Sequence, residues 1–398
     1  MANSNLTNAK RAKNDEFYTQ YADIQKEIGA YLDYDANVFR GKVVYCNCDD
    51  PFESNFFRYF VLNFNKLGLK QLITTSYKPS PIANTELVLQ PTLLPGYEDN
   101  VVRKPSEPKG RPKVTANKFV INNVGDIDGD GEFNLKDVAK QLQANKHNEW
   151  MPLEKDGDFR SPECVELLGK ADIVVTNPPF SLFRKYVKQL FDYNKRFVII
   201  GNKSSVTYKE IFPLIKDNKM WSGKTEWSGG LWFVTVDDND VDKVIDGVNM
   251  KNVSSVWFTN LDHGRRHQPL PLMTMEENLK YSKHKEIKGK TAYVRYDNHD
   301  AIEVPFTDAI PSDYDGVMGV PISFLDKYSP DQFVILGMCE NEDLYKLKTK
   351  VYTSTECKQA YLDKFGKKGT YDLNASGVVI RDGLKEKVYQ RVLIKHKK

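Results

Sequence analysis

Short apolar runs alternate with segments of helical periodicity through the first half of the chain. The runs are rich in β-branched residues and too short for helices, so each predicts a strand that is buried on both faces. They lie at residues 42–47, 69–76, 172–176 and 196–201. The segments that predict helices are residues 14–33, 52–64 and 182–191. This alternation predicts an α/β fold with a parallel sheet that helices cover.

The pattern changes at two places. Seven prolines lie within residues 78–113, which predicts an irregular insertion on the surface. From about Trp221 the chain becomes richer in short strands, aromatic residues and turns. We therefore predict a change of domain near this residue. The predicted divisions are residues 1–220, with an insertion at about residues 78–156, and residues 221–398.

Composition excludes several classes of protein. The chain has 398 residues, 40% of them hydrophobic, and a net charge of +3, which permits an acidic partner without requiring one. No apolar stretch is long enough to span a membrane, and the polar N-terminus cannot be a secretory signal. The five cysteines lack the paired spacing of zinc sites, so we expect reduced thiols in a cytoplasmic protein and no bound metal.

The junction at Asp172–Phe180 carries the most specific chemistry in the sequence. Its apolar run ends at Asn177, and two prolines and an aromatic residue follow. Pro178 disfavours a helical conformation at Asn177, and each proline has a fixed φ. The predicted turn is therefore stiff and non-helical. It places an amide oxygen, a carbonyl oxygen and a ring at the carboxyl end of a parallel strand, where α/β sheets bind ligands.

Such a turn suits the alkylation of an exocyclic or amide-like nitrogen. If Asn177 Oδ1 and the Pro178 carbonyl accept the two N–H bonds, the nitrogen is drawn toward tetrahedral geometry and no strong base is needed. Phe180 would stack on the base, a contact worth roughly 1–3 kcal/mol. The alternative is a buried strand followed by an ordinary proline turn.

Acidic residues follow the first predicted strand. Asp49 and Asp50 lie at the first strand–helix turn, where a sheet of this kind usually holds a nucleoside cofactor. A carboxylate there can accept a hydrogen bond from an amino or hydroxyl group. A surface turn is the alternative, because Glu53 and Asn55 stand where small residues would allow a closer approach.

A second acidic and aromatic pair precedes the Asn177 strand. Asp158 and Phe159 come just before a short helix that has Pro162 in its first turn. A carboxylate and a ring can hold an adenine through its amino group and its face. The pair is weak evidence alone and gains weight from its position shortly before the Asn177 turn.

Residues 126–137 have the spacing of a calcium-binding loop. The carboxylates in that spacing are Asp126, Asp128, Asp130 and Asp137. The last ligand of such loops is usually a bidentate glutamate, and the pattern occurs once, so a solvated turn is the preferred interpretation.

A basic segment lies in the C-terminal half, where His263 and His267 flank Arg265 and Arg266. A metal site at this histidine spacing requires a helix, whereas the segment is predicted to be a loop. We therefore interpret Arg265 and Arg266 as DNA-binding residues. Contact with phosphate is the preferred interpretation, and pairing with guanine is the alternative.

Together the motifs resemble the EcoRI family of adenine-specific DNA methyltransferases over nearly the whole chain. The segments that carry the resemblance are Asn14–Gln20, Val43–Pro51, Gly157–Ser161, Asp172–Arg184, Thr207–Phe212, Thr259–Asp262, Tyr296–Asn298 and Asp315–Pro321. By this resemblance the catalytic motif is Asn177, Pro178, Pro179 and Phe180. The residues that match the cofactor site are Phe17, Tyr18, Thr19, Asn47, Asp49, Asp50, Asp158 and Phe159.

The resemblance implies a Rossmann-like catalytic domain that binds S-adenosylmethionine, followed by a C-terminal target-recognition region. It implies methyl transfer to N6 of an adenine that is flipped out of double-stranded DNA. The role would be restriction-modification or DNA protection, with a cognate restriction endonuclease as the functional partner. Two departures limit the match: the first strand lacks a glycine-rich turn, and the second ends in Thr74, Thr75 and Ser76 without an acidic ribose ligand.

Two other functions remain open at this point. Similar turns methylate RNA or glutamine side chains of proteins, but those enzymes are not expected to share the segments at Asn260, Asp262 and Asp315–Pro321. An inactive DNA-binding relative is the other possibility, and the intact Asn177 motif argues against it.

Overall fold

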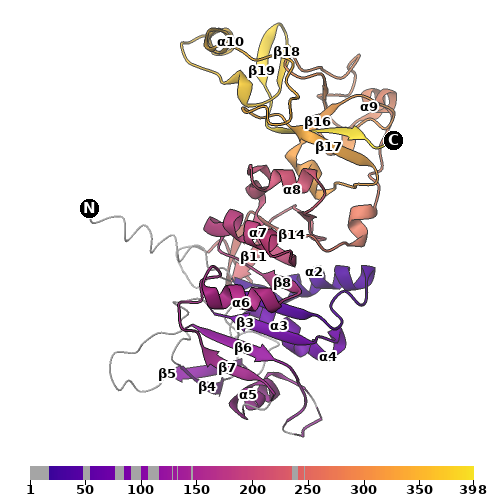
Figure 1. The fold of residues 1–398 in the computed structure, drawn as a ribbon. Helices are drawn as coiled ribbons and strands as arrows, with labels where there is room; N and C mark the ends of the chain where they lie inside the picture. Colours follow the sequence, from indigo (N-terminus) through magenta and orange to yellow (C-terminus); the bar gives the residue numbers. More distant parts are fainter. Residues whose placement is uncertain are drawn as a thin grey trace, which may run out of the picture. The chain divides into compact units, whose positions relative to one another are not determined.

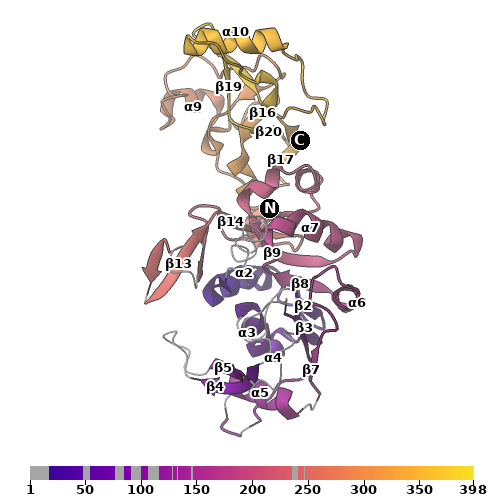
Figure 2. The same cartoon turned by 90° about the vertical axis from the view of Figure 1, so that its left-hand side faces the viewer.

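The computed structural model describes most of the chain. The described residues are 18–47, 54–76, 85–90, 100–105, 116–127, 129–131, 133–144, 147–234, 241–245 and 247–398. The chain forms two compact units, whose elements are labelled in Figures 1 and 2. Unit 1 contains Met1–Phe212 and Met220–Gly264, and unit 2 contains Pro213–Lys219 and Arg265–Lys398. No helix in the described part is both long and apolar enough to cross a membrane.

Unit 1 is built on a mixed sheet of eight strands in the order β10-β14-β9-β8-β2-β3-β6-β7. The four central strands are parallel, and they confirm the four strands predicted from the apolar runs. They are β2 (Val43–Asn47), β3 (Gln71–Thr75), β8 (Ile173–Thr176) and β9 (Arg196–Asn202). The outer strands are antiparallel to their neighbours: β6 (Asn117–Ile121), β7 (Glu149–Pro152), β14 (Ser255–Thr259) and β10 (Trp221–Ser222).

Helices cover both faces of this sheet. Figure 2 shows α2, α3 and α4 on one side of the central strands and α6 and α7 on the other. The helices are α2 (Tyr21–Tyr34), α3 (Asn55–Leu62), α4 (Phe64–Leu67), α5 (Leu135–Ala144), α6 (Pro162–Lys170) and α7 (Phe183–Asp192). The helix expected from residue 14 begins only at Tyr21, because Tyr18 and Thr19 form a strand. The core between α2, α3 and the sheet is apolar, and Trp257 is among its largest fully buried side chains.

A second, antiparallel sheet in unit 1 has the order β1-β11-β13-β12. Its strands are β1 (Tyr18–Thr19), β11 (Leu231–Val234), β13 (Val248–Val253) and β12 (Lys243–Ile245). Residues 220–264, which the sequence pattern grouped with the C-terminal region, thus lie in unit 1. The physical reason is pairing: β14 pairs with β9 along five residues and β11 pairs with β1.

The expected insertion is more regular than its prolines indicate. β4 (Thr85–Gln90) and β5 (Asn100–Pro105) form a two-stranded antiparallel sheet, so the prediction of an irregular segment is wrong there. Pro105, one of the seven prolines, is the last residue of β5. β6 and β7, also within the expected insertion, extend the main sheet.

Unit 2 contains a four-stranded sheet in the order β15-β16-β20-β17 and a β18–β19 hairpin. The strands are β15 (Ile302–Glu303), β16 (Met318–Pro321), β20 (Arg391–His396), β17 (Phe333–Met338), β18 (Val378–Arg381) and β19 (Leu384–Lys387). The helices are α9 (Met275–Tyr281) and α10 (Ser354–Phe365), and α8 (Phe212–Lys216) leads into this unit. Further 3₁₀ turns in this unit are η4 (Thr307–Ala309), η5 (Ile322–Asp326) and η6 (Leu373–Ala375). A buried ion pair joins Arg391 Nη2 to Glu303 Oε1 at 2.6 Å.

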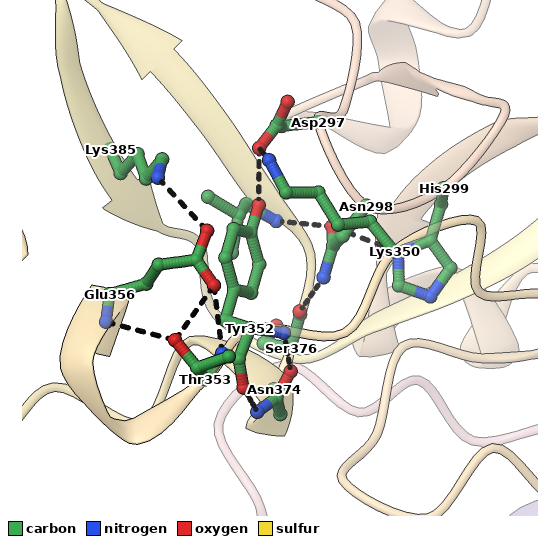
Figure 3. Close-up of polar contacts among 11 residues, drawn as sticks. Asp297, Asn298, His299, Lys350, Tyr352, Thr353, Glu356, Asn374, Ser376 and Lys385 are labelled. Carbon is green, nitrogen blue, oxygen red and sulfur yellow. Dashed lines mark hydrogen bonds and ion pairs between the residues drawn. The ribbon is translucent and has the colours of Figure 1, made fainter.

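A polar cluster in unit 2 ties the loop after Tyr296 to the start of β18 (Figure 3). Asn298 Nδ2 donates to the Ser376 carbonyl at 2.9 Å, and Asn298 Oδ1 accepts from the Val378 amide at 2.8 Å. These bonds fix the amide orientation, so His299 Nδ1 must donate to Asn298 Oδ1, 3.0 Å away. The buried His299 ring therefore carries a proton on Nδ1.

Unit 2 is expected to lose stability in acid through His299. Burial, with a smaller effect of nearby Lys348, lowers the pKa of His299 to about 4. Between pH 6.5 and 4 the unfolded chain binds a proton that the folded unit does not. The contribution of His299 to the free energy of unfolding is therefore complete above pH 6.5. It falls by about 2 kcal/mol between pH 7 and pH 5. Urea unfolding at both pH values should show a weaker pH dependence in His299→Asn than in the wild type. The control His147→Asn, at an exposed histidine of unit 1, should keep it. Equal pH dependence in wild type and His299→Asn would contradict the assignment.

Candidate active site

The carboxyl ends of the parallel strands in unit 1 meet at one edge of the sheet. In the sheet, β2 and β8 are neighbours. The strand that follows β2 in the chain, β3, lies on one side of this pair, and the strand that follows β8, β9, lies on the other side. Open α/β sheets bind their ligands outside the strand ends at such a reversal. Asn47 is the last residue of β2, and Asn177 directly follows β8. The fold therefore brings two of the predicted site residues to the ends of these neighbouring strands.

Buried hydroxyl groups bind the ends of three strands together. Thr75 Oγ1, at the end of β3, lies 3.2 Å from Asn47 Oδ1 and 3.0 Å from the hydroxyl of Tyr45. The Thr176 hydroxyl, at the end of β8, donates to the Asn47 carbonyl. Asn47, Thr75 and Thr176 are each at most 2% exposed. This network makes the sheet edge rigid, and it explains why threonines end a strand where an acidic residue is absent.

The Asn177 turn has the predicted non-helical form through Pro179. Asn177, Pro178 and Pro179 belong to no helix or strand, and a 3₁₀ turn, η1 (Phe180–Leu182), then leads into α7. The Leu182 amide donates to the Pro179 carbonyl at 3.0 Å. Asn177 is half-buried and Pro178 is buried. Phe180 is half-buried and packs against the core of unit 1, so its ring keeps some exposure beside the turn.

The segment Gly157–Phe159 lies against the end of β3. Gly157 has a φ of +78°, and a Cβ there would lie 2.0 Å from the Ser76 carbonyl oxygen. Asp158 follows with its carboxylate bound by Arg160, at 2.5 Å from Nη2 and 2.8 Å from Nε. Hydrogen bonds from Arg160 lower the pKa of Asp158, so the carboxylate is anionic. This segment thus lies beside the end of β3, the strand next to β2 in the sheet.

Phe159 is more deeply buried than its predicted ligand contact requires. Its ring is 2% exposed and forms an edge contact with Tyr186 of α7, with centroids 4.9 Å apart. Gln189 Nε2 also donates to the Phe159 carbonyl at 3.1 Å. The ring joins this segment to α7, and Asp158 is the member of the pair that keeps solvent access.

The N-terminal segment is held between the second sheet and α3. Thr19 pairs with Phe233 of β11, and Asn55 Nδ2 donates to the Thr19 carbonyl at 2.8 Å. Thr19 is 5% exposed, and its buried hydroxyl has no hydrogen-bond partner within the described structure. Of the other predicted cofactor residues, Tyr18 is described only in its backbone. Phe17, Asp49 and Asp50 lie outside the described residues.

A buried carboxylate that the sequence analysis missed supports this arrangement. Glu27 of α2 is fully buried and accepts bonds from the Lys224 amide at 2.7 Å and the Thr225 amide at 2.8 Å. The Tyr31 hydroxyl donates to it at 2.7 Å. These bonds hold the loop between β10 and β11 on α2, the helix that follows β1. The signal was present in the sequence, because Glu27 lies on the same helical face as Ile24, Ile28 and Tyr31.

The two predicted DNA-binding arginines are engaged within unit 2. Arg265 and Arg266 lie in a 3₁₀ turn, η3 (Gly264–His267). Arg265 forms an ion pair of 3.0 Å with Asp326, and its side chain is 17% exposed. Arg266 is 7% exposed and donates through Nη2 to Asn218 Oδ1. The premise that this segment is too basic to be buried is wrong, because Asp326 pairs with Arg265 and Asn218 accepts a hydrogen bond from Arg266.

Arg266→Ala is therefore expected to act on stability. Loss of the buried guanidinium removes a charged hydrogen bond and packed methylenes, which costs about 2 kcal/mol of unfolding free energy. The salt dependence of DNA binding should stay as in the wild type. Urea unfolding and binding at several salt concentrations measure both quantities. A salt slope lower by about one unit, with unchanged stability, would instead support the phosphate contact.

Two carboxylates of the acidic loop accept hydrogen bonds from backbone amides. Asp126 accepts from the Gly129 and Gly131 amides at 2.7 and 2.8 Å. Asp137 is fully buried and accepts from the Ile127 and Asn134 amides at 2.8 and 2.9 Å. These contacts form a turn that precedes α5. Asp128 lies outside the described residues.

Metal-site candidates can be judged for the described residues only. Among them, no group of three or more His, Cys, Asp or Glu side chains is arranged to hold a metal ion. His263 Nε2 donates to the Ser222 carbonyl at 3.0 Å, and His267 Nδ1 lies 2.7 Å from an Asp331 oxygen. The four described cysteines are buried: Cys46, Cys164, Cys339 and Cys357.

Unit 1 is thus an α/β unit with an Asn-Pro-Pro-Phe turn at a strand end, beside a reversal of strand order. The model of the family described as adenine-specific methyltransferase EcoRI matches residues 5–397, and the chain belongs to this family. It is therefore an adenine-specific DNA methyltransferase.

Individual relatives agree with the family match. The chain is 40% identical to the type II methyltransferase M.EcoRI of Escherichia coli over 347 residues, which cover 86% of this chain and 91% of the relative. It is 33% identical to the type II methyltransferase M.MpnI of Mycoplasma pneumoniae over 353 residues, which cover 86% and 89%. A Mycoplasma genitalium relative, M.MgeORF184P, is also 33% identical. No solved structure matches the chain.

Proposed function

We propose that this protein transfers a methyl group from S-adenosylmethionine to N6 of one adenine within a short double-stranded DNA sequence. The observation that carries the proposal is the Asn177–Phe180 turn at the end of β8, directly beside the end of β2. Type II methyltransferases are the relatives over most of the chain, which favours a restriction-modification role with a cognate endonuclease as functional partner.

The residues at the sheet edge fit a nucleoside cofactor. We propose that Asn47 and Thr75 would form the floor of this site and that Asp158 would offer a carboxylate beside it. The buried Thr19 hydroxyl has no hydrogen-bond partner in the described structure and would be available to the cofactor. We propose that unit 1 is a Rossmann-like cofactor domain in which Asp158 contacts the adenine amino group and Phe159 positions Asp158. Bound S-adenosylmethionine would supply an electrophilic methyl group on its sulfonium. Tyr18 and Thr19, held by β11 and Asn55, would close the site.

The acceptor amine would be activated by the Asn177 turn. Asn177 Oδ1 and the Pro178 carbonyl would each accept a hydrogen bond from one N–H group of the amine. Those acceptors are most favourable when the nitrogen becomes tetrahedral and gains positive charge, so they stabilise the transition state more than the ground state. The part of the Phe180 ring that remains exposed would stack on the adenine. Two prolines and the η1 turn restrict the conformations of this segment.

An adenine inside a duplex cannot reach this turn, so the base must be flipped out. We propose that unit 2 supplies most of the target recognition and holds the opened duplex. The strands of residues 220–264 belong to the catalytic unit, since they complete its two sheets. An RNA or glutamine acceptor is less favoured, because the family match continues through unit 2.

Transfer assays with purified protein test the proposal. Tritiated S-adenosylmethionine is supplied with genomic duplex DNA, with total RNA or with a mixed protein extract, and the product is hydrolysed and analysed. N6-methyladenine in the DNA alone is the expected result. Label in RNA or in glutamine residues, with none in DNA, would overturn the proposal.

A further inference from the structure

Positive charge is concentrated on one exposed segment of unit 2. Residues 280–290 contain five lysines and one carboxylate, Glu286, in a chain whose net charge is only +3. The lysines are Lys280, Lys283, Lys285, Lys288 and Lys290, and all five are exposed. We call this set the lysine platform. The rest of the molecule is close to neutral, so the platform is a local feature.

The backbone of the platform is held rigidly from within. Ser282 and Ile287 are 2% and 3% exposed, and the His284 ring stacks on Phe306 with centroids 3.6 Å apart. The Gly289 amide, at a φ of +77°, donates to the Leu279 carbonyl at 2.8 Å. The side chains that point inward therefore anchor the loop, and the lysines project outward between them. A preordered array loses less conformational entropy when it binds a partner.

Most of the platform charge is not neutralised within the protein. Lys283 pairs with Asp308 at 2.7 Å, in an exposed ion pair of the kind that is worth little. The other four lysines take part in no ion pair within the described structure. The polar cluster of Figure 3 differs, because Lys350 lies 2.8 Å from Asp297 and Lys385 lies 3.8 Å from Glu356. The platform is thus the better surface for an external anion.

We infer that the lysine platform binds the DNA backbone during target recognition. The inference rests on the proposed function, which supplies a duplex with about one phosphate charge per 1.7 Å of its axis. Lysine ammonium groups act as point charges and suit phosphates more than base edges. The platform therefore contributes affinity and orientation, and it adds the same binding energy on every sequence.

Charge-neutralising variants test the inference. The variant Lys280→Gln, Lys285→Gln, Lys288→Gln and Lys290→Gln removes four positive charges from the platform. A matched control removes four exposed lysines elsewhere in unit 2, with the same change in net charge. It combines Lys346→Gln, Lys358→Gln, Lys367→Gln and Lys368→Gln. Binding to a methylation substrate and to a scrambled duplex is measured across salt concentrations, and thermal unfolding shows whether each variant is folded.

The platform variant should bind both duplexes more weakly, with a salt slope lower by about two units or more, since each lost phosphate contact removes about one. The control should lower the slope by less than about one unit. An unchanged slope in the platform variant, or an equal loss in the control, would overturn the inference. The proposed function would still stand if the wild type methylates the substrate. A wild type that neither binds nor methylates duplex DNA would overturn both.

Discussion

Asn177→Ala is expected to lower the methyl-transfer rate by about a hundred- to a thousand-fold, which is the effect of removing one preorganised group that stabilises transition-state charge. Cofactor and DNA affinity should change little. The reason is that Oδ1 gains most of its interaction energy only when the amine nitrogen becomes tetrahedral. The side chain is half-buried in a turn held by two prolines, so its loss should leave the turn in place.

Single-turnover rates, with separate measurements of cofactor and DNA binding, provide the test. Phe180→Tyr and Phe180→Ala are the companion variants. The first keeps a ring for stacking and should stay far more active than the second. Near-normal turnover in Asn177→Ala would contradict the proposed role of Asn177 as an acceptor. Loss of both cofactor and DNA binding would instead show that the variant no longer forms the turn.

Gly157→Ala is expected to destabilise unit 1 and to weaken cofactor binding together. A non-glycine residue at a φ of +78° is strained by roughly 1–3 kcal/mol. The added Cβ would also lie 2.0 Å from the Ser76 carbonyl, so the segment must move away from the end of β3. We expect a loss of about 3 kcal/mol of unfolding free energy and at least a tenfold weaker cofactor affinity. The second effect follows because Asp158 would move with the backbone.

Gly169→Ala is the matched control. Gly169 lies within α6 of the same unit, and a Cβ there would meet nothing within 4 Å. An alanine in a helix should therefore raise stability by up to about 1 kcal/mol and leave cofactor affinity unchanged. If Gly157→Ala matches the wild type in both measurements, Asp158 is not held at the site in the way described.

Local signals explain what could be predicted from the sequence. The four parallel strands are continuous β-branched runs, and the Asn177 turn depends on the prolines that directly follow the strand. Both features arise within a few residues, so they are readable without knowledge of the fold. The short helix at Pro162 was predictable from local signals too, since the Ser161 side chain accepts a hydrogen bond from the Cys164 amide at the start of the helix.

Pairing between distant segments explains what could not be predicted. Tyr18 and Thr19 would continue a helical segment, but they pair with β11, more than two hundred residues away. Arg266 was expected to be exposed because its neighbours are basic, yet its guanidinium donates a hydrogen bond to the distant Asn218. Phe159 is an aromatic residue beside an acidic one, which suggests a ligand contact. Its burial depends on the contact with Tyr186 of α7, which the sequence does not show.

The most direct test of the central claim is to map N6-methyladenine in DNA from cells that express this chain or its Asn177→Ala variant. The host must lack other adenine methyltransferases. The account predicts methylation of one adenine within a single short recognition sequence, at nearly every copy, with the wild type and almost none with the variant. Unmethylated DNA with the folded wild type, or equal methylation with the variant, would contradict it.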